Sequence, residues 1–335
     1  MLDFFKKHDY PKINETSSLP ELSKGLFLPV WGNVTSTIDW CEENYVQSSF
    51  IAEFCNTISN MTYILVAGIL YHRLTYKLNI LEKRFKLTMI GLLLVGLGSA
   101  MFHMSLRYDC QLLDELPMIY ITCIPCYSVL CEPLLYKKNK EGADEEETSI
   151  LIQNENKFIA VSKKLEYFVA LSLTVISLIM TFSYIYYITN PIFHEVCYAI
   201  LNAIIVYCAS YLTRKHINDI EVKTNLIKSS LRGVSLFALG FVLWGLDRQY
   251  CKSLIYVRRE YLKLPLGNIL ELHAYWHIFT GLGLYYMLNF LIFLRINLHN
   301  KIKGDVYYET NGGYKMDWIF FRQVPVMRKT PQTCR

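Results

Sequence analysis

Seven stretches of this 335-residue chain are long and apolar enough to cross a lipid bilayer. A membrane-spanning helix needs about 20 mostly apolar residues to cross roughly 30 Å of hydrocarbon. The composition agrees, because 53% of the residues are hydrophobic and only 19% are charged, which excludes an ordinary soluble enzyme. We therefore predict an all-α polytopic membrane protein, a bundle of seven transmembrane helices near residues 52–72, 85–106, 112–136, 167–189, 192–213, 231–250 and 269–294.

The predicted spans divide the chain into an N-terminal segment, 1–51, a seven-span domain, 52–294, and a tail, 295–335. Residues 1–30 lack the uninterrupted apolar core of a cleavable signal peptide. We therefore expect the first span to direct membrane insertion.

The distribution of basic residues predicts the orientation. Most of the 34 lysines and arginines fall in the loops after the first, third and fifth spans and in the tail, and such loops usually stay in the cytosol. We expect a luminal N-terminus and a cytosolic C-terminus, in the endoplasmic reticulum or Golgi membrane. Sequons at Asn14 and Asn33 support this weakly, whereas the basic loop 248–268 is the main objection. The net charge of +5 follows from this topology, and no basic–aromatic pattern predicts binding to nucleic acid.

Two of the ten cysteines, Cys41 and Cys251, are expected on the oxidising side of the membrane, close to the ends of spans. We predict a disulfide between them that ties the N-terminal segment to the loop between the sixth and seventh spans. Cys110 is the competing partner. Cys123 and Cys126 have CxxC spacing, but the motif stands alone in an apolar helix, which favours packing over a metal or redox role.

The last predicted span contains two histidines one helical turn apart, His273 and His277, in the segment HAYWH. Ionisable side chains are costly in a bilayer and usually face a cavity or a partner. Ser99 and His103 have the same i, i+4 spacing and share one face of the second span. Asp114 follows a short turn that brings it back to the depth of His103. All five residues are therefore expected in the outer half of the bilayer.

Three histidines at one depth predict a catalytic zinc site, with His103, His273 and His277 as ligands and a fourth position open for water. HAYWH lacks the Glu that follows the first His in the HExxH motif, so Asp114 is the candidate base. Ser99 is the candidate donor to the developing oxyanion, or it orients the water. The spacing alone leaves other interpretations open: a histidine that only packs, an Asp114 that only supports a histidine, and a Ser99 bonded to its own helix.

Three segments, DWCEENYVQSSFIAEFCNTISN (39–60), GSAMFHMSLRYDCQLLDELPMIY (98–120) and HAYWHIFTGLG (273–283), resemble the alkaline ceramidases. The resemblance runs in order from about Trp31 to Arg295. It implies a seven-span membrane amidase that takes ceramide from the bilayer and hydrolyses it to a sphingoid base and a fatty acid. It also implies the same three histidines as zinc ligands, with Ser99 and Asp114 beside the zinc-bound water.

The resemblance further implies a calcium ion beside the first span. The matching positions are Asp39, Trp40, Glu42, Asn44 and Glu53, of which Trp40 would offer only its backbone carbonyl. Calcium prefers about six to eight oxygen ligands, and this set is rich in them. The residues alone do not decide the point, because DWCEEN is equally typical of a solvated acidic segment or a helix N-terminus.

Two other functions are considered. The wider group that the resemblance points to includes the adiponectin receptors, so a seven-span lipid receptor or sensor is an alternative; those receptors have a cytosolic N-terminus. A transporter that uses the histidines as a proton relay is disfavoured, because the chain lacks the repeated halves typical of many transporters.

Overall fold

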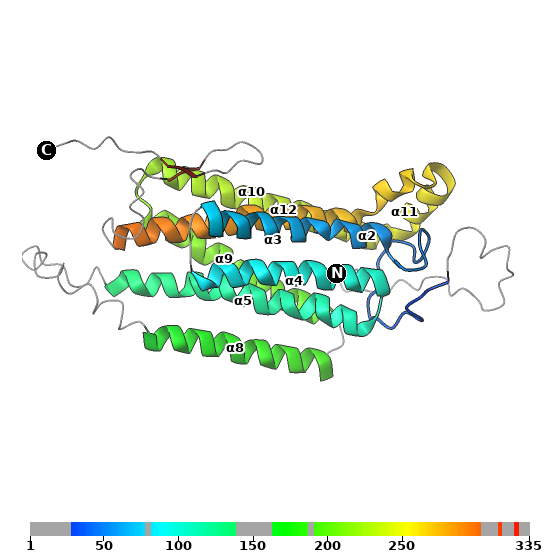
Figure 1. Ribbon diagram of the computed structural model, residues 1–335, viewed down its shortest axis with the longest axis horizontal. Coiled ribbons are helices and arrows are strands. Elements are labelled where there is room, and N and C mark those ends of the chain that lie inside the picture. Colours follow the sequence, from blue (N-terminus) through cyan, green and yellow to red (C-terminus); the bar gives the residue numbers. More distant parts are fainter. Residues whose placement is uncertain are drawn as a thin grey trace, which may run out of the picture.

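The computed structural model describes residues 28–77, 82–138, 163–186 and 191–302, together with two short strands. Within these residues, seven helices are long and apolar enough to cross a membrane. They cover Phe54–Tyr76, Lys83–Ser105, Tyr108–Glu132, Lys164–Tyr186, Ile192–His216, Ile220–Gln249 and Leu272–Leu298. The predicted all-α bundle is confirmed, and the chain is an integral membrane protein whose helices run side by side (Figure 1).

The first span consists of three pieces, α2 (Phe54–Ser59), α3 (Met61–His72) and a single π-helical turn, η2 (Arg73–Lys77). The other spans belong to α4 (Lys83–Ser105), α5 (Tyr108–Lys138), α8 (Lys163–Tyr186), α9 (Pro191–His216), α10 (Ile220–Gln249) and α12 (Leu272–Ile302). Between α10 and α12 lie α11 (Cys251–Val257), η4 (Arg258–Leu262) and η5 (Leu266–Leu270). In the tail, β1 (Tyr314–Met316) pairs antiparallel with β2 (Pro325–Met327).

The sixth span differs most from its predicted limits, because α10 begins at Ile220 rather than near 231. Asp219 caps the helix: its side chain accepts a hydrogen bond of 3.0 Å from the backbone N–H of Val222. Hydropathy misses the first turns because they carry charged residues such as Lys223 and Lys228, which a helix tolerates at its solvated end. The last helix also differs from its prediction: α12 continues to Ile302, past residue 294, where the seven-span domain was predicted to end.

The turn between α4 and α5 fixes the N-terminal segment to the bundle. Leu106 is fully buried in a left-handed conformation, with φ of 50°, and its N–H bonds to the carbonyl of Phe102 at 2.7 Å. The carbonyl of Leu106 accepts the N–H groups of Thr35 and Ser36, each at 3.1 Å. The segment before the first span is therefore held across the end of this hairpin.

Helix α12 lies at the centre of the bundle and α8 at its edge. In α12, 72% of the apolar span is buried, whereas in α8 only 11% is. Figure 1 shows α8 beside α5, at one side of the molecule. Two glycines bring α10 and α12 together: a Cβ atom at Gly233 would lie 3.0 Å from the carbonyl oxygen of Gly283. Larger residues at either position would push the two helices apart.

A charged cluster near the C-terminal end of α12 joins this helix to α5 and to the residue before α4. The buried Arg295 pairs with Glu132 of α5, and its Nε lies 3.5 Å from a carboxylate oxygen of Glu82, which precedes α4. Nearby in sequence, Tyr285 accepts a 2.5 Å hydrogen bond from Arg73. A buried charge is costly unless it is paired, and Arg295 is paired with both carboxylates. We call the group of Arg295, Glu132 and Glu82 the charge clamp.

Candidate functional site

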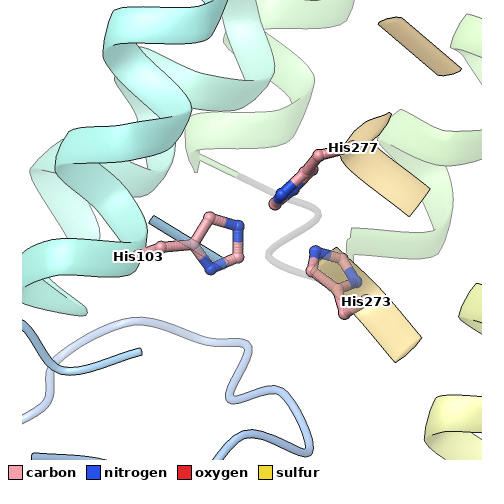
Figure 2. A group of neighbouring side chains, drawn as sticks. All are labelled: His103, His273 and His277. Atoms are coloured by element: carbon pink, nitrogen blue, oxygen red, sulfur yellow. The ribbon is translucent and has the colours of Figure 1, made fainter. Parts of the chain in front are cut away.

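Three histidines from two helices meet at the end of the bundle opposite the charge clamp. His103 comes from the last turn of α4, and His273 and His277 from the first turns of α12. One ligand nitrogen from each ring lies within 4.8 Å of the other two, and each residue is at most 3% exposed. Figure 2 shows the rings turned toward one another across a common space. In the part of the chain that the structure describes, this is the one cluster of at least three metal-binding side chains, and it could hold a metal ion.

Hydrogen bonds to side chains outside the cluster orient two of the histidine rings. A hydrogen bond of 2.5 Å joins Nδ1 of His103 to the carboxylate of Glu53, and one of 2.7 Å joins Nδ1 of His277 to the hydroxyl of Ser59. Carboxylates and hydroxyls that hold one ring nitrogen leave the other nitrogen for a metal, a common support of histidine ligands. Nδ1 of His273 is buried and has no hydrogen-bond partner among the described residues. Such a nitrogen fits a ligand role.

Trp40 covers the histidine cluster. Its ring stacks on that of His273, with centroids 4.0 Å apart and planes inclined by 19°. The backbone N–H of Trp40 also donates to the Glu53 carboxylate at 3.2 Å. The N-terminal segment therefore contacts His273 through a side chain and reaches His103 through Glu53.

Ser99 and Asp114 lie beside the histidines, as the hairpin prediction requires. A hydrogen bond joins the two side chains, and both line the same cavity as the three histidines. Gly98 allows this, because a Cβ atom at that position would lie 2.2 Å from the backbone oxygen of Leu113. A larger residue would separate α4 from α5 and pull Asp114 away from Ser99.

A cavity of about 240 Å³ extends from the histidines into the bundle. Its lining follows α4 from His103 to Thr88, about 22 Å at the rise of an α-helix, and α12 from His273 to Leu291, about 27 Å. Aromatic rings gather near the histidines, among them Trp276, whose ring meets that of Phe237 edge to face at 5.3 Å. Trp276 therefore lines the cavity. The cavity is shaped for a long apolar chain with a reactive group at the histidine end.

The predicted calcium-binding residues lie beside this site, but their side chains bond to protein groups. Asn44 donates to Asp39 at 3.1 Å, and Glu42 accepts the backbone N–H groups of Cys55 and Asn56 at 2.7 and 2.8 Å. The carboxylates of Asp39, Glu42 and Glu53 do not form a metal-binding cluster of the kind that the histidines form.

The electrostatics of this segment nevertheless suit a cation. Burial, followed by repulsion from Glu53, raises the pKa of Glu42 to about 8. Burial and the neighbouring Asp39 also hold the pKa of Glu53 well above its usual range. The Oδ1 atom of Asn44 is buried and has no hydrogen-bond partner among the described residues. The segment thus gathers carboxylates that repel one another, and a bound cation would relieve this repulsion.

The predicted disulfide is confirmed. Cys41 and Cys251 are bonded, and Cys110 is a free thiol. The buried Arg258 reinforces the link by donating to the carbonyl of Cys41 at 2.7 Å and by pairing with Glu271. The loop between α10 and α12 is thereby fastened to the N-terminal segment, above the histidine cluster.

The sequence predicted five of the residues that line the cavity but not the side chains that support them. Ser59 was not considered, and Glu53 was considered only as a calcium ligand. Their contacts join residues 218 and 50 positions apart in the sequence, and no local spacing indicates such pairs. One signal was available: Glu53 and Asn56 are polar residues at the edge of an apolar span, where an unpaired carboxylate would be costly.

Comparisons with known proteins agree with the site. The chain is 42% identical to the alkaline ceramidase YPC1 of Saccharomyces cerevisiae over 267 residues, 80% of this chain and 79% of the relative. It is 34% identical to alkaline ceramidase 3 of Mus musculus over 270 residues, 79% and 86% of the two chains. An alkaline ceramidase of Arabidopsis thaliana is 29% identical over 267 residues, again 79% and 86%. The model of the family described as Ceramidase matches residues 32–319, and the chain therefore belongs to the ceramidase family.

Proposed function

We propose that this protein hydrolyses the amide bond of ceramide inside the membrane, in a metal-dependent reaction that yields a sphingoid base and a fatty acid. The observation that carries the proposal is the buried histidine cluster at one end of a long apolar cavity, in a member of the ceramidase family. An amide that carries two long chains matches a cavity with polar groups at one end and apolar walls beyond them.

The metal that fits best is zinc, held by His103, His273 and His277. Neutral imidazoles are typical zinc ligands, and three of them leave a coordination position open for catalysis. When bound, zinc would supply a Lewis acid that activates water near neutral pH and polarises a carbonyl. Glu53 and Ser59 would fix the ring orientations of two of the ligands, His103 and His277, through their hydrogen bonds to Nδ1.

Asp114 is the group that would move the protons. In the reaction, a C–O bond forms to water and the C–N bond of the amide breaks. Asp114 would take a proton from the water and pass it to the leaving amine, which regenerates the Asp114 carboxylate. Ser99, which is hydrogen-bonded to Asp114 before the reaction, would turn its single hydroxyl hydrogen to the oxygen of the amide as negative charge develops on it.

Calcium would organise the N-terminal segment. The candidate ligands are Asp39, Glu42, Asn44 and Glu53, together with the backbone carbonyl of Trp40. Because Trp40 stacks on His273 and Glu53 bonds to His103, order in this segment would be transmitted directly to two zinc ligands.

Replacement of Asp39 by Asn separates the calcium proposal from the zinc proposal, because Asp39 accepts a hydrogen bond from Asn44, whereas Glu53 contacts the candidate zinc ligand His103 directly. We expect Asp39→Asn to weaken calcium binding and to leave bound zinc unchanged. Glu43→Gln is the control, since Glu43 pairs with the exposed Arg259. Equal calcium affinity in Asp39→Asn and the parent protein would refute this assignment.

The expected orientation puts the histidine end on the luminal side, in the endoplasmic reticulum or Golgi membrane. Asn33 is exposed at this end and belongs to a glycosylation sequon. Glycosylation of Asn33, detected as a mass shift lost in Asn33→Gln, supports a luminal N-terminus. If a reagent confined to the cytosol labels a cysteine placed at residue 33, the predicted orientation is wrong.

The test of the activity is hydrolysis by the purified chain in nanodiscs that contain ceramide. Mass spectrometry should find the sphingoid base and the fatty acid in equal amounts. His277→Ala in the same nanodiscs should yield neither product. A folded parent protein that leaves ceramide intact would refute the proposed function and favour the receptor alternative.

A further inference from the structure

Glu195 is an acidic residue on the cavity wall that the proposed reaction does not use. It lies near the start of α9 and opens a stripe of lining residues, followed at helical spacing by Tyr198, Asn202 and Ile205. Its side chain is 30% exposed. A carboxylate at the edge of an apolar cavity needs a hydrogen-bond donor or a positive charge.

The other acidic residues on the wall already have hydrogen-bond donors. Asp114 bonds to Ser99, and Glu115 accepts from the hydroxyl of Tyr184 and from Gln111. Glu195 differs, because its one contact among the described residues is with Arg248, at 3.6 Å, beyond hydrogen-bonding distance. An ionised carboxylate has about four lone-pair positions, so Glu195 keeps its capacity to accept hydrogen bonds from a ligand.

A chain of side-chain contacts places Glu195 at the histidine end of the cavity. The guanidinium of Arg248 lies over the rings of Trp244, at 5.0 Å, and of Trp40, at 5.7 Å. Trp40 in turn stacks on His273. Glu195 is therefore linked to His273 through two side chains, Arg248 and Trp40, and it lines the cavity where the polar head of a lipid would lie.

Ceramide carries two hydroxyl groups close to its amide, on the first and third carbons of the sphingoid base. If the amide lies at the histidines, as the proposed function requires, these hydroxyls lie at the same end of the cavity as Glu195. We propose that Glu195 accepts a hydrogen bond from a hydroxyl of the sphingoid base and so selects hydroxylated substrates. This inference rests on the proposed function. Arg248 would favour the ionised form of this carboxylate.

The physical basis of the selection is the strength of a hydrogen bond to a charged acceptor. A hydrogen bond to a charged group is worth more than one between neutral groups, and a buried polar group that loses its partner is penalised. Sites built to bond a substrate hydroxyl therefore reject analogues that lack it. Apolar chains of many kinds fit the rest of the cavity, so this contact would distinguish ceramide from other lipid amides.

The experiment compares three lipid amides with one acyl chain: N-acylsphinganine and its analogues without the first or the third hydroxyl. We expect the parent protein to prefer N-acylsphinganine to at least one analogue by about 10- to 100-fold in kcat/KM. In Glu195→Ala the preference over that analogue should collapse toward one, because the analogue that lacks the contacted hydroxyl has no contact to lose. Glu195→Gln keeps a neutral acceptor and should retain part of the preference.

Glu115→Gln is the matched control, because it changes a cavity-lining carboxylate whose bonds are to protein groups. It should lower stability or overall activity without changing the ratios between substrates. Equal losses on all three amides in Glu195→Ala would show a structural role and overturn the inference, as would parent ratios near one for both analogues. These results differ from failure of the proposed function, in which the parent protein would cleave none of the three amides.

Discussion

The two ends of the helix bundle bury polar side chains in different ways. At the charge clamp, Arg295 contacts two carboxylates, and the group joins α12 to α5 and to the residue before α4. At the histidine end, three imidazoles face one another, and Nδ1 of His273 has no partner among the described residues. Buried polar groups with partners hold a structure together, whereas buried groups that lack them indicate a binding site.

The largest effect is expected at Asp114. Asp114→Asn keeps the shape of the side chain but removes the base, so hydrolysis should fall by about 100- to 10,000-fold while zinc content stays the same. Asp109→Asn is the control: Asp109 lies one turn earlier in α5 and is exposed. Parent-like turnover in Asp114→Asn, measured as release of the sphingoid base, would remove Asp114 from the mechanism.

At the charge clamp, mutation should change stability instead of chemistry. Arg295→Met leaves Glu132 buried without its partner, and we expect a loss of about 3–5 kcal/mol in the free energy of unfolding. The folded fraction should keep its kcat/KM for ceramide. The double variant Arg295→Met/Glu132→Leu should regain most of the lost stability in thermal unfolding. Loss of activity without loss of stability in Arg295→Met would contradict the separate roles of the charge clamp and the histidine end.

The disulfide at the histidine end should also act through stability. Removal of a native disulfide typically costs about 2–5 kcal/mol, and the bridge between Cys41 and Cys251 closes a long segment. We expect Cys251→Ser to unfold at a lower temperature and to hydrolyse ceramide almost normally well below that temperature. Cys110→Ser, which removes a free thiol, should unfold like the parent protein.

The smallest effect is expected at Glu53, which hydrogen-bonds to the candidate zinc ligand His103 but is not itself a proposed zinc ligand. Glu53→Gln preserves size but replaces the charged partner of His103, and second partners of this kind are worth about 10- to 100-fold in metal affinity. Zinc affinity should be measured by competition with a chelator at saturating calcium, with Glu43→Gln as the control. Unchanged zinc affinity would mean that the contact between Glu53 and His103 is incidental.

The sequence predicted the fold well because membrane spans obey a local rule. A run of apolar residues of sufficient length identifies a span, and all seven were located. The same rule misplaced the start of α10, since charged residues such as Lys223 lie on a helix that extends beyond the apolar run. Helix limits at a membrane edge are decided by capping residues such as Asp219, which hydropathy does not register.

The candidate site was predictable in part. The i, i+4 spacing of His273 and His277, with the depth of His103, identified the cluster, and the short turn after α4 placed Asp114 near it. The stacking of Trp40 on His273 and the bond between Ser59 and His277 could not be predicted, because they depend on how an irregular segment folds over the bundle. Glu195 was missed for a related reason: a single glutamate near a span end is ordinary until a cavity is seen beside it.

The central claim is that the histidine cluster holds the metal that ceramide hydrolysis requires. The most direct measurement is metal analysis of the purified protein together with its rate of ceramide hydrolysis, for the parent chain and for His103→Ala. The parent protein should retain about one zinc per chain and cleave ceramide, and the variant should lose both while it unfolds at a similar temperature. Full hydrolysis by a protein that contains no metal would contradict the account.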